Sequence, residues 1–361
     1  MPNSPIIRFN ISSGKNPKSR PRKRKLNLQY CLIKIASFVS LVFLCSSTFC
    51  KDLPDNITLQ MSSQIIARSG DVITGKKISN PNGPCILVNQ VKRVTITGNQ
   101  IGPCGTDPRY EVGISVNESN NIQIIGNTFK AVSSALYATN SQLGQLLFEG
   151  NQATEIRGPA PRGQLVQLNQ YSGPQIVIRC NVSDQAIGGY INQDGKGGPE
   201  DHINIYKSSG TLNSPIQILD NKLRGGGSKS GGGILAVDGG NGAHVLIKDN
   251  ILVDAGQYGI GIPAGEDITV KHNRIFASPH SWTNVGIYVW NQYAGTACSR
   301  TEISGNQVNY RNLKGTSNPY WNSGNCGKVS IAEPNRLQDE SITQTIWNES
   351  PASCKTSWRT W

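Results

Sequence analysis

Five titratable residues of types that perform acid–base chemistry lie in one part of the chain. Asp194, Asp201, His202 and Lys207 follow one another closely, and Asp238 comes about one sequence repeat later. Lysine and histidine can remove a proton, and carboxyl groups can donate one, accept one or hold a cation. Whether these side chains act together depends on the fold that carries them.

The chain is built on a repeated phrase: a short alternating apolar stretch, a bend, an asparagine and a further apolar residue. Residues 94–101 read Val-Thr-Ile-Thr-Gly-Asn-Gln-Ile, with the bend at Gly98 and Asn99. The asparagines of the eight copies are Asn99, Asn127, Asn151, Asn181, Asn221, Asn250, Asn273 and Asn306, spaced 28, 24, 30, 40, 29, 23 and 33 positions apart. Such a repeat indicates one elongated unit, because each copy buries its apolar face only against its neighbours.

The repeats predict an all-β protein. Each supplies two or three strands of alternating character, and no stretch has apolar residues at helical spacing. The two-residue turns that hairpins need are missing, so each strand should pair in parallel with its counterpart one turn later, about 4.8 Å away. The sequence therefore predicts a single-stranded parallel β-helix, in which the repeated asparagines form an inward hydrogen-bonded ladder.

The motif apolar-x-apolar-x-Gly-Asn-x-apolar, present in residues 94–101 and 122–129, resembles the right-handed parallel β-helix proteins of the pectin-lyase-like superfamily. The resemblance covers roughly residues 85–310 and implies a right-handed coil. Most members of that superfamily are secreted enzymes that act on polysaccharides, and others are adhesins or tail-spike-like binders. The sequence lacks the Asp-Asp and Arg-x-Lys signature of polygalacturonases and the Asp-Pro-His motif of mannuronan epimerases, so no member family is identified.

The net charge of +12 is concentrated at the N-terminus. Residues 1–50 hold nine of the 35 Lys and Arg residues and no acid, which leaves 26 basic and 23 acidic residues elsewhere. A nucleic-acid partner is therefore not expected. The basic cluster at 20–25 and the uncharged run at 35–49 predict a cleaved secretory signal, with an uncleaved signal-anchor as the alternative. The run is short for a span of about 20 residues.

The expected organisation is a targeting segment at 1–50, an N-terminal cap at 51–84, the β-helix at 85–310 and a C-terminal cap at 311–361. The expected location is extracellular or periplasmic, which permits disulfides. Cys85 with Cys104 and Cys298 with Cys326 would each close a local loop. Cys180 precedes a ladder asparagine, and a buried free thiol is one interpretation of it.

Alternation along a second family of strands predicts which side chains face outward. One outward row contains Tyr137, Gln167, Asn204, Leu235, Gly261 and Tyr288. A second contains Thr139, Asn169, Tyr206, Val237, Pro263 and Trp290. A third, at the strand exit, sets Lys207 beside Asp238 on adjacent turns. Aromatic rings, amides and a charged pair on one face suit a sugar chain, with Tyr206, Gln167, Asn169, Tyr288, Trp290 and Tyr137 as candidate binding residues.

The 40-residue interval between Asn181 and Asn221 contains a Gly-rich insertion, which should bring Asp194, Glu200, Asp201 and His202 within reach of Lys207 and Asp238. The sequence favours a secreted enzyme that cleaves an acidic polysaccharide by β-elimination, because Lys and His accompany the acids. In such a lyase, Lys207 or His202 would be the base. Asp238 and Asp201 would position that base or hold a cation, with Ca²⁺ as the candidate cofactor. A glycoside hydrolase would pair Asp238 with Asp201 or Asp194. A non-catalytic surface protein that binds glycans or a host partner is the alternative, and whether the chain is a monomer or a trimer stays open.

Overall fold

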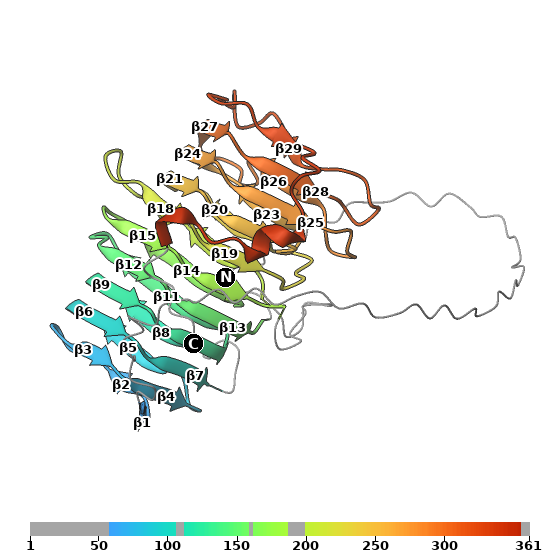
Figure 1. Ribbon diagram of the computed structural model, residues 1–361. Helices are drawn as coiled ribbons and strands as arrows, with labels where there is room; N and C mark the ends of the chain where they lie inside the picture. The colour runs from blue at the N-terminus through green and yellow to red at the C-terminus, as the bar shows by residue number, and fades with distance from the viewer. Residues whose placement is uncertain (1–57, 106–111, 159–161, 187–198, 355–361) are drawn as a thin grey trace, which may run out of the picture. The chain divides into compact units, whose positions relative to one another are not determined.

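In the computed structural model, Thr58–Trp361 forms one compact unit that winds as a coil, and each full turn adds one strand to each of three sheets (Figure 1). The described residues are 58–105, 112–158, 162–186 and 199–354. The predicted targeting segment at 1–50 and Asp194 lie outside them. Every strand pairing within the three sheets is parallel, as expected when a strand can pair only with its counterpart one turn away.

Sheet B has ten strands, and its outer face carries the candidate site. They are β2 (Ile65–Ile66), β5 (Ile86–Asn89), β8 (Val112–Asn117), β11 (Ser134–Ser141), β14 (Gln164–Tyr171), β17 (Ile203–Tyr206), β20 (Ile234–Asp238), β23 (Tyr258–Ile262), β26 (Val285–Val289) and β29 (Tyr320–Asn322).

Sheet C follows sheet B in each turn and has nine strands. They are β3 (Val72–Thr74), β6 (Lys92–Thr97), β9 (Asn120–Ile125), β12 (Leu146–Glu149), β15 (Ile176–Arg179), β18 (Ile216–Leu219), β21 (Ala243–Lys248), β24 (Gly265–Lys271) and β27 (Cys298–Ser304).

Sheet A completes the turn with eleven strands. They are β1 (Gln60–Ser62), β4 (Lys76–Asn80), β7 (Gln100–Cys104), β10 (Thr128–Val132), β13 (Gln152–Ile156), β16 (Val182–Asp184), β19 (Lys222–Arg224), β22 (Ile251–Val253), β25 (Arg274–Ala277), β28 (Gln307–Tyr310) and β30 (Arg336–Leu337). The coil thus extends on both sides of residues 85–310. The described residues contain two short 3-10 helices, η1 (Gln344–Asn348) and η2 (Ala352–Cys354), and no helix among them is long and apolar enough to cross a membrane.

The inward positions of all three sheets fill one continuous apolar core. On sheet B, the predicted inward residues such as Leu136, Val166 and Ile203 are fully buried. Sheets C and A contribute mostly isoleucine, valine and leucine, with Phe129 and Phe148 among the largest buried side chains. Branched side chains stack well on matching positions of successive turns, so the core is repeated along the coil.

The predicted asparagine ladder is present at the corner between sheets C and A. Each side-chain amide from Asn99 to Asn306 donates to the Oδ1 of the asparagine one turn along, over 2.9–3.1 Å. The same Oδ1 also accepts the backbone N–H of the preceding ladder asparagine over 2.9–3.1 Å. Asn335 adds a ninth rung that the sequence did not predict. The ladder therefore satisfies polar groups that the tight corner removes from water.

Three disulfides connect the six cysteines of the described residues. Cys85–Cys104 and Cys298–Cys326 are the predicted local pairs. Cys180 is bonded to Cys354, 174 positions away, so its interpretation as a free thiol was wrong. The asparagine after the bend points inward, and Cys180 occupies the slot before it, with a φ of 55°. Neighbouring turns place half-exposed Asp220 and Asp249 in this slot, so Cys180 faces outward toward the C-terminal segment.

Candidate active site on the outer face of sheet B

The first predicted outward row exists as a column of register partners. Tyr137 pairs with Gln167, Gln167 with Asn204, and Asn204 with Leu235. The column continues through Gly261 to Tyr288, and then to Trp321, which the sequence had assigned to the C-terminal cap. This column forms the outer face of sheet B along most of the coil.

The second predicted row breaks at β20, where the register shifts. Tyr206 pairs with Asp238 rather than with Val237. Val237 has a φ of 57° and its side chain is fully buried in the core, so its prediction as an outward residue was wrong. An extra residue in one strand reverses the alternation that follows it. Asp238 consequently stands on the outer face beside Tyr206, where alternation alone would have placed Val237.

Asn204 links the two carboxylates of the site. Its Nδ2 donates to Asp201 Oδ2 over 3.0 Å and to Asp238 Oδ2 over 3.1 Å. Because both bonds leave one nitrogen, the two carboxylates face each other across a single amide. Asn204 lies in the predicted outward row, but no sequence signal marked it as the bridge between acids one turn apart.

Two tyrosines complete the hydrogen bonding of these carboxylates. Tyr258, from β23, donates its hydroxyl to Asp201 Oδ1 over 2.5 Å, and the backbone N–H of Gly232 donates to the same oxygen over 2.8 Å. Tyr293, from the turn after β26, donates to Asp238 Oδ1. Burial raises the pKa of both tyrosines, so each phenol stays protonated and available as a donor.

The two aspartates differ in exposure and therefore in what they can do. Asp201 is only 3% exposed, and all of its described partners are internal. Burial, together with the nearby charge of Glu200, raises its pKa to about 7. Asp238 is half-exposed at the end of β20. Asp238 can thus touch a bound molecule, and Asp201 acts on it by orienting Asn204.

Glu200 is a third acid of the site; the sequence placed it within reach of Lys207 and Asp238 but gave it no role. It is half-exposed, and burial raises its pKa, with a smaller contribution from the charge of Asp238. Hydrogen bonds to Ser230 and Ser228 oppose the shift. Both serines belong to the Gly-rich stretch at 225–233. A carboxyl group with a raised pKa near an exposed carboxylate can act as a proton donor.

His202, a predicted base, points into the protein. It is 1% exposed, with Nδ1 2.9 Å from Ser183 Oγ and Nε2 3.0 Å from the carbonyl oxygen of Gly225. Burial lowers its pKa to about 4. Both ring nitrogens are thus occupied by internal partners, and the structure contradicts the prediction that His202 serves as the base.

Lys207, the other predicted base, lies at the opposite end of β17 from Glu200 and Asp201. Its backbone N–H donates to the carbonyl oxygen of Asp238 over 2.9 Å, so the two residues are backbone neighbours as predicted. Its side chain is exposed, with Nζ 5.2 Å from the centre of the Tyr206 ring. Among the described residues no carboxylate forms an ion pair with Lys207, and the predicted Lys207–Asp238 charged pair is replaced by contact with Tyr206.

The aspartates do not fit the predicted role as Ca²⁺ ligands. All four carboxylate oxygens of Asp201 and Asp238 accept hydrogen bonds from Asn204, Tyr258 or Tyr293. These donors take one acceptor position on each oxygen, and Asp201, at 3% exposed, is closed to a cation from solution. Within the part of the chain that the structure describes, one group of His, Cys, Asp and Glu has ligand spacing, and both of its cysteines, Cys180 and Cys354, form a disulfide.

The remaining predicted binding residues extend the site along the coil in both directions. On one side, Asn169 donates to the hydroxyl of Tyr137 over 2.8 Å, and Gln167 donates to Asn204 Oδ1 over 3.2 Å. On the other side, the Tyr288 ring covers Gly261, where a Cβ atom would come within 2.5 Å of it. Trp290 meets Trp321 edge-on, with ring centres 5.9 Å apart. Amides and rings therefore flank the acids.

Three all-parallel sheets around an asparagine ladder define a parallel β-helix protein. The chain matches the family model described as right handed beta helix region over residues 58–182 and 113–308, and it belongs to that family. The predicted right-handed parallel β-helix fold is thereby confirmed. No curated protein matches the sequence.

Two solved structures illustrate what the fold is similar to. The alginate lyase from Paenibacillus sp. str. FPU-7 aligns with a TM-score of 0.46 and 13% identity, over 76% of this chain and 94% of that one. The catalytic domain of GH87 alpha-1,3-glucanase in complex with nigerose aligns with a TM-score of 0.38 and 12% identity, over 74% of this chain and 55% of that one.

Proposed function

We propose that the protein is an exported carbohydrate-active enzyme that cleaves a polysaccharide on the outer face of sheet B. The observation that carries the proposal is the half-exposed carboxylate of Asp238, held by Asn204 and Tyr293 in the middle of a face of amides and aromatic rings. Gln167, Asn204 and Tyr288 are buried in this face, so stacking for sugar rings and hydrogen bonds for hydroxyl groups would come from the half-exposed Tyr137, Asn169, Tyr206 and Trp290. The three disulfides support export, because such bonds persist in oxidising compartments.

Hydrolysis is the reaction that these residues serve best. Glu200, whose pKa is raised, donates its proton to the glycosidic oxygen and so releases the leaving sugar. Asp238 either attacks the anomeric carbon or takes a proton from the attacking water. Asp201 keeps Asn204 aimed at Asp238, so it is a positioning residue.

The sequence alone favoured β-elimination by a lyase, with Lys207 or His202 as the base. His202 is enclosed, and Lys207 stands over Tyr206 beyond the end of β17. Asp201 and Asp238, in contrast, meet through Asn204, and the charge of Asp238 contributes to the raised pKa of Glu200. Hydrolysis therefore replaces elimination as the preferred mechanism, and absorbance at 235 nm distinguishes the two because only elimination creates an unsaturated sugar.

The test is a screen of neutral and acidic polysaccharides, read for new reducing ends and for absorbance at 235 nm. Asp238→Asn and Glu200→Gln should each lower the rate roughly 10²-fold or more. Glu302→Gln, on the outer side of β27, is the matched control and should keep full activity. An activated aryl glycoside needs no leaving-group proton, so it should restore Glu200→Gln but not Asp238→Asn.

Two results would oppose this mechanism. Wild-type activity in both Asp238→Asn and Glu200→Gln would show that the protein is an enzyme but that these two residues are not catalytic. Binding of a glycan without cleavage of any tested polysaccharide would instead support the non-catalytic alternative.

A further inference from the structure

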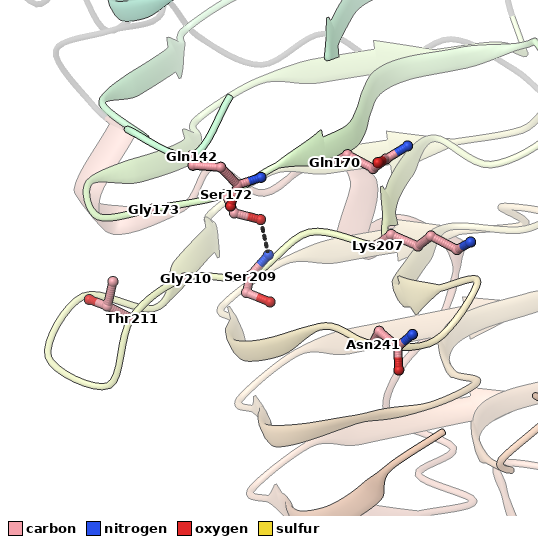
Figure 2. A pocket seen from close by; sticks show the side chains of 9 residues that line it. All are labelled: Gln142, Gln170, Ser172, Gly173, Lys207, Ser209, Gly210, Thr211 and Asn241. Atoms are coloured by element: carbon pink, nitrogen blue, oxygen red, sulfur yellow. Dashed lines mark hydrogen bonds between the residues drawn. The ribbon is translucent and has the colours of Figure 1, made fainter. Parts of the chain in front are cut away.

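A second feature of the same region is a pocket of about 480 Å³ at the corner where sheet B turns into sheet C (Figure 2). Its lining includes Gln170 and Ser172 from one turn, Lys207, Ser209 and Thr211 from the next, and Asn241 from the third. Figure 2 shows the Lys207 and Gln170 side chains extending to the same side, with the Ser209 N–H donating to Ser172 Oγ over 2.9 Å. No sequence pattern predicted this pocket.

The residues that line the pocket could bind an anion, because neutral hydrogen-bond donors surround one positively charged side chain. Lys207 is the one charged side chain among the lining residues, and the others offer hydroxyls, side-chain amides or backbone. Gln170, Lys207 and Asn241 have φ values of 55°, 46° and 56°. This left-handed conformation is uncommon for residues with a side chain, and all three of these residues are exposed at the corner.

The Lys207 ammonium group is available to a ligand, because the acids of the site are bonded to other residues. Asp238, the carboxylate of the neighbouring turn, is held by Tyr293 and Asn204, and the Tyr206 ring lies beneath the Lys207 ammonium. No carboxylate of the described residues pairs with Lys207. An ammonium group that is exposed and lacks an internal counter-ion attracts a negatively charged group from solution.

We propose that this corner pocket is a subsite for the anionic substituent of a sugar, a carboxylate or a sulfate ester, and that Lys207 binds it. The inference rests on the proposed function and names its substrate class as an acidic polysaccharide. The 2.9 Å bond between Lys207 N and the carbonyl oxygen of Asp238 sets the pocket next to the candidate active site. One glycan chain can therefore occupy both. Lys207 becomes a binding residue rather than the base that the sequence suggested.

The test is affinity electrophoresis of the intact Asp238→Asn protein, in which a bound glycan is not cleaved. Gels would contain polygalacturonate or its neutral methyl ester, and a sulfated galactan or its desulfated form. These pairs separate the charge from the backbone, and the two arms distinguish carboxylate from sulfate. Each gel compares Lys207→Met, Lys207→Arg and Lys314→Met, whose exposed lysine lies in a loop between β28 and β29.

The expected result is retardation by one charged glycan and not by its neutral form. Lys207→Met should weaken that binding about tenfold, Lys207→Arg should retain most of it, and Lys314→Met should not change it. Equal binding by Lys207→Met, equal binding of charged and neutral forms, or no binding of any acidic glycan would each overturn the subsite.

This proposal and the proposed function fail in different ways. Lys207-dependent binding by a wild-type protein that cleaves none of these glycans would sustain the subsite and reject the enzyme. Cleavage of neutral polysaccharides alone, unchanged in Lys207→Met, would sustain the enzyme and reject the subsite.

Discussion

Asp201 and His202 are adjacent in sequence, and both are buried, yet they serve opposite sides of sheet B. Asp201 orients Asn204 on the outer face, whereas His202 contacts Ser183 and Gly225 inside the coil. Burial acts on both by disfavouring the charged form, which raises the pKa of the carboxyl group and lowers that of the imidazole. Their contributions to stability should therefore respond to pH with opposite signs.

The first prediction at this scale concerns the window between pH 4 and 6.5. Unfolded Asp201 loses its proton near 3.8, but the folded protein keeps it until about 7, so stability falls as pH rises through this interval. Unfolded His202 gains a proton below 6.5, but the folded protein resists until about 4, so stability falls as pH drops. The two trends oppose each other in the wild type.

Asp201→Asn should leave only the pH dependence of stability that His202 contributes. Its melting temperature, relative to wild type, should fall as pH is lowered from 6.5 to 4, and His202→Gln should show the reverse. Asp249→Asn, a half-exposed acid on the sheet C side, serves as the control. Parallel melting curves for wild type and both variants across this window would show that neither group keeps its proton state on folding.

At this scale the sequence predicts residue types better than roles. It singled out Asp201, His202, Lys207 and Asp238, but only the structure shows which of them are enclosed. Glu200 was named without a role, because its partners, Ser228 and Ser230, come from a Gly-rich stretch one turn away. Roles set by burial and by contacts between turns have no local signature in the chain.

At the scale of the elements, the corner before each ladder asparagine is the most uniform feature. The preceding residue is in the left-handed region in all eight predicted copies, whether it is Gly98 with a φ of 62° or Asp249 with 57°. Glycine reaches this conformation without cost, and a residue with a Cβ atom pays for the same turn. The fold therefore imposes the corner on side chains that do not favour it.

Gly126 and Asp249 allow this cost to be measured in both directions. Gly126 has a φ of 61° and no atom within 4 Å of an added Cβ, so Gly126→Ala should lower the free energy of unfolding by about 1 kcal/mol through backbone strain alone. Asp249→Gly should raise it by a smaller amount, because the surface ion pair with Lys248 is lost as well. Urea denaturation measures both.

The sign of each change in the free energy of unfolding shows whether the backbone or the side chains determine the stability of this corner. A stable Gly126→Ala protein, together with a destabilised Asp249→Gly protein, would mean that side-chain contacts rather than the backbone hold this corner.

The elements also show how far alternation predicts register. Counting along the strands gave the correct outward column from Tyr137 to Tyr288, because period-two alternation repeats in each turn. It failed at β20, where Val237 turns inward and moves Asp238 onto the outer face. The extra residue in β20 cannot be recognised from the sequence, because the apolar Val237 looks like any other strand residue there. The candidate site lies where that rule was interrupted.

At the scale of the whole unit, the C-terminal segment runs along the side of the coil rather than over its open end. Ile342 and Ile346 pack on Ile251 and Val253, and Trp347 lies against Lys222 and Arg224 of sheet A. The red segment in Figure 1 can be followed across these strands. Cys354 then joins it to Cys180. The sequence did not show the surface on which Trp347 lies, because its contacts with Lys222 and Arg224 join residues more than a hundred positions apart.

The Cys180–Cys354 bond should be the disulfide on which the stability of this unit depends most. In the chain-entropy account, a cross-link removes more freedom from the unfolded chain when it closes a longer loop. This bond spans 174 positions, against 28 for Cys298–Cys326 and 19 for Cys85–Cys104. Replacing Cys180 and Cys354 by serine should cost about 2–4 kcal/mol, measured from the urea midpoint.

The Cys298→Ser, Cys326→Ser protein is the matched comparison, since it loses one bond of the same kind from a much shorter loop. Its loss should be smaller by about 1.6 kcal/mol in the chain-entropy account. Limited proteolysis adds a local measure, because without its bond the segment after β30 is held by Ile342, Ile346, Trp347 and the Arg274–Glu349 ion pair. Earlier cleavage there, with the coil still folded, would show that the bond fastens the segment. Equal midpoints for the two double variants would refute the dependence on loop length.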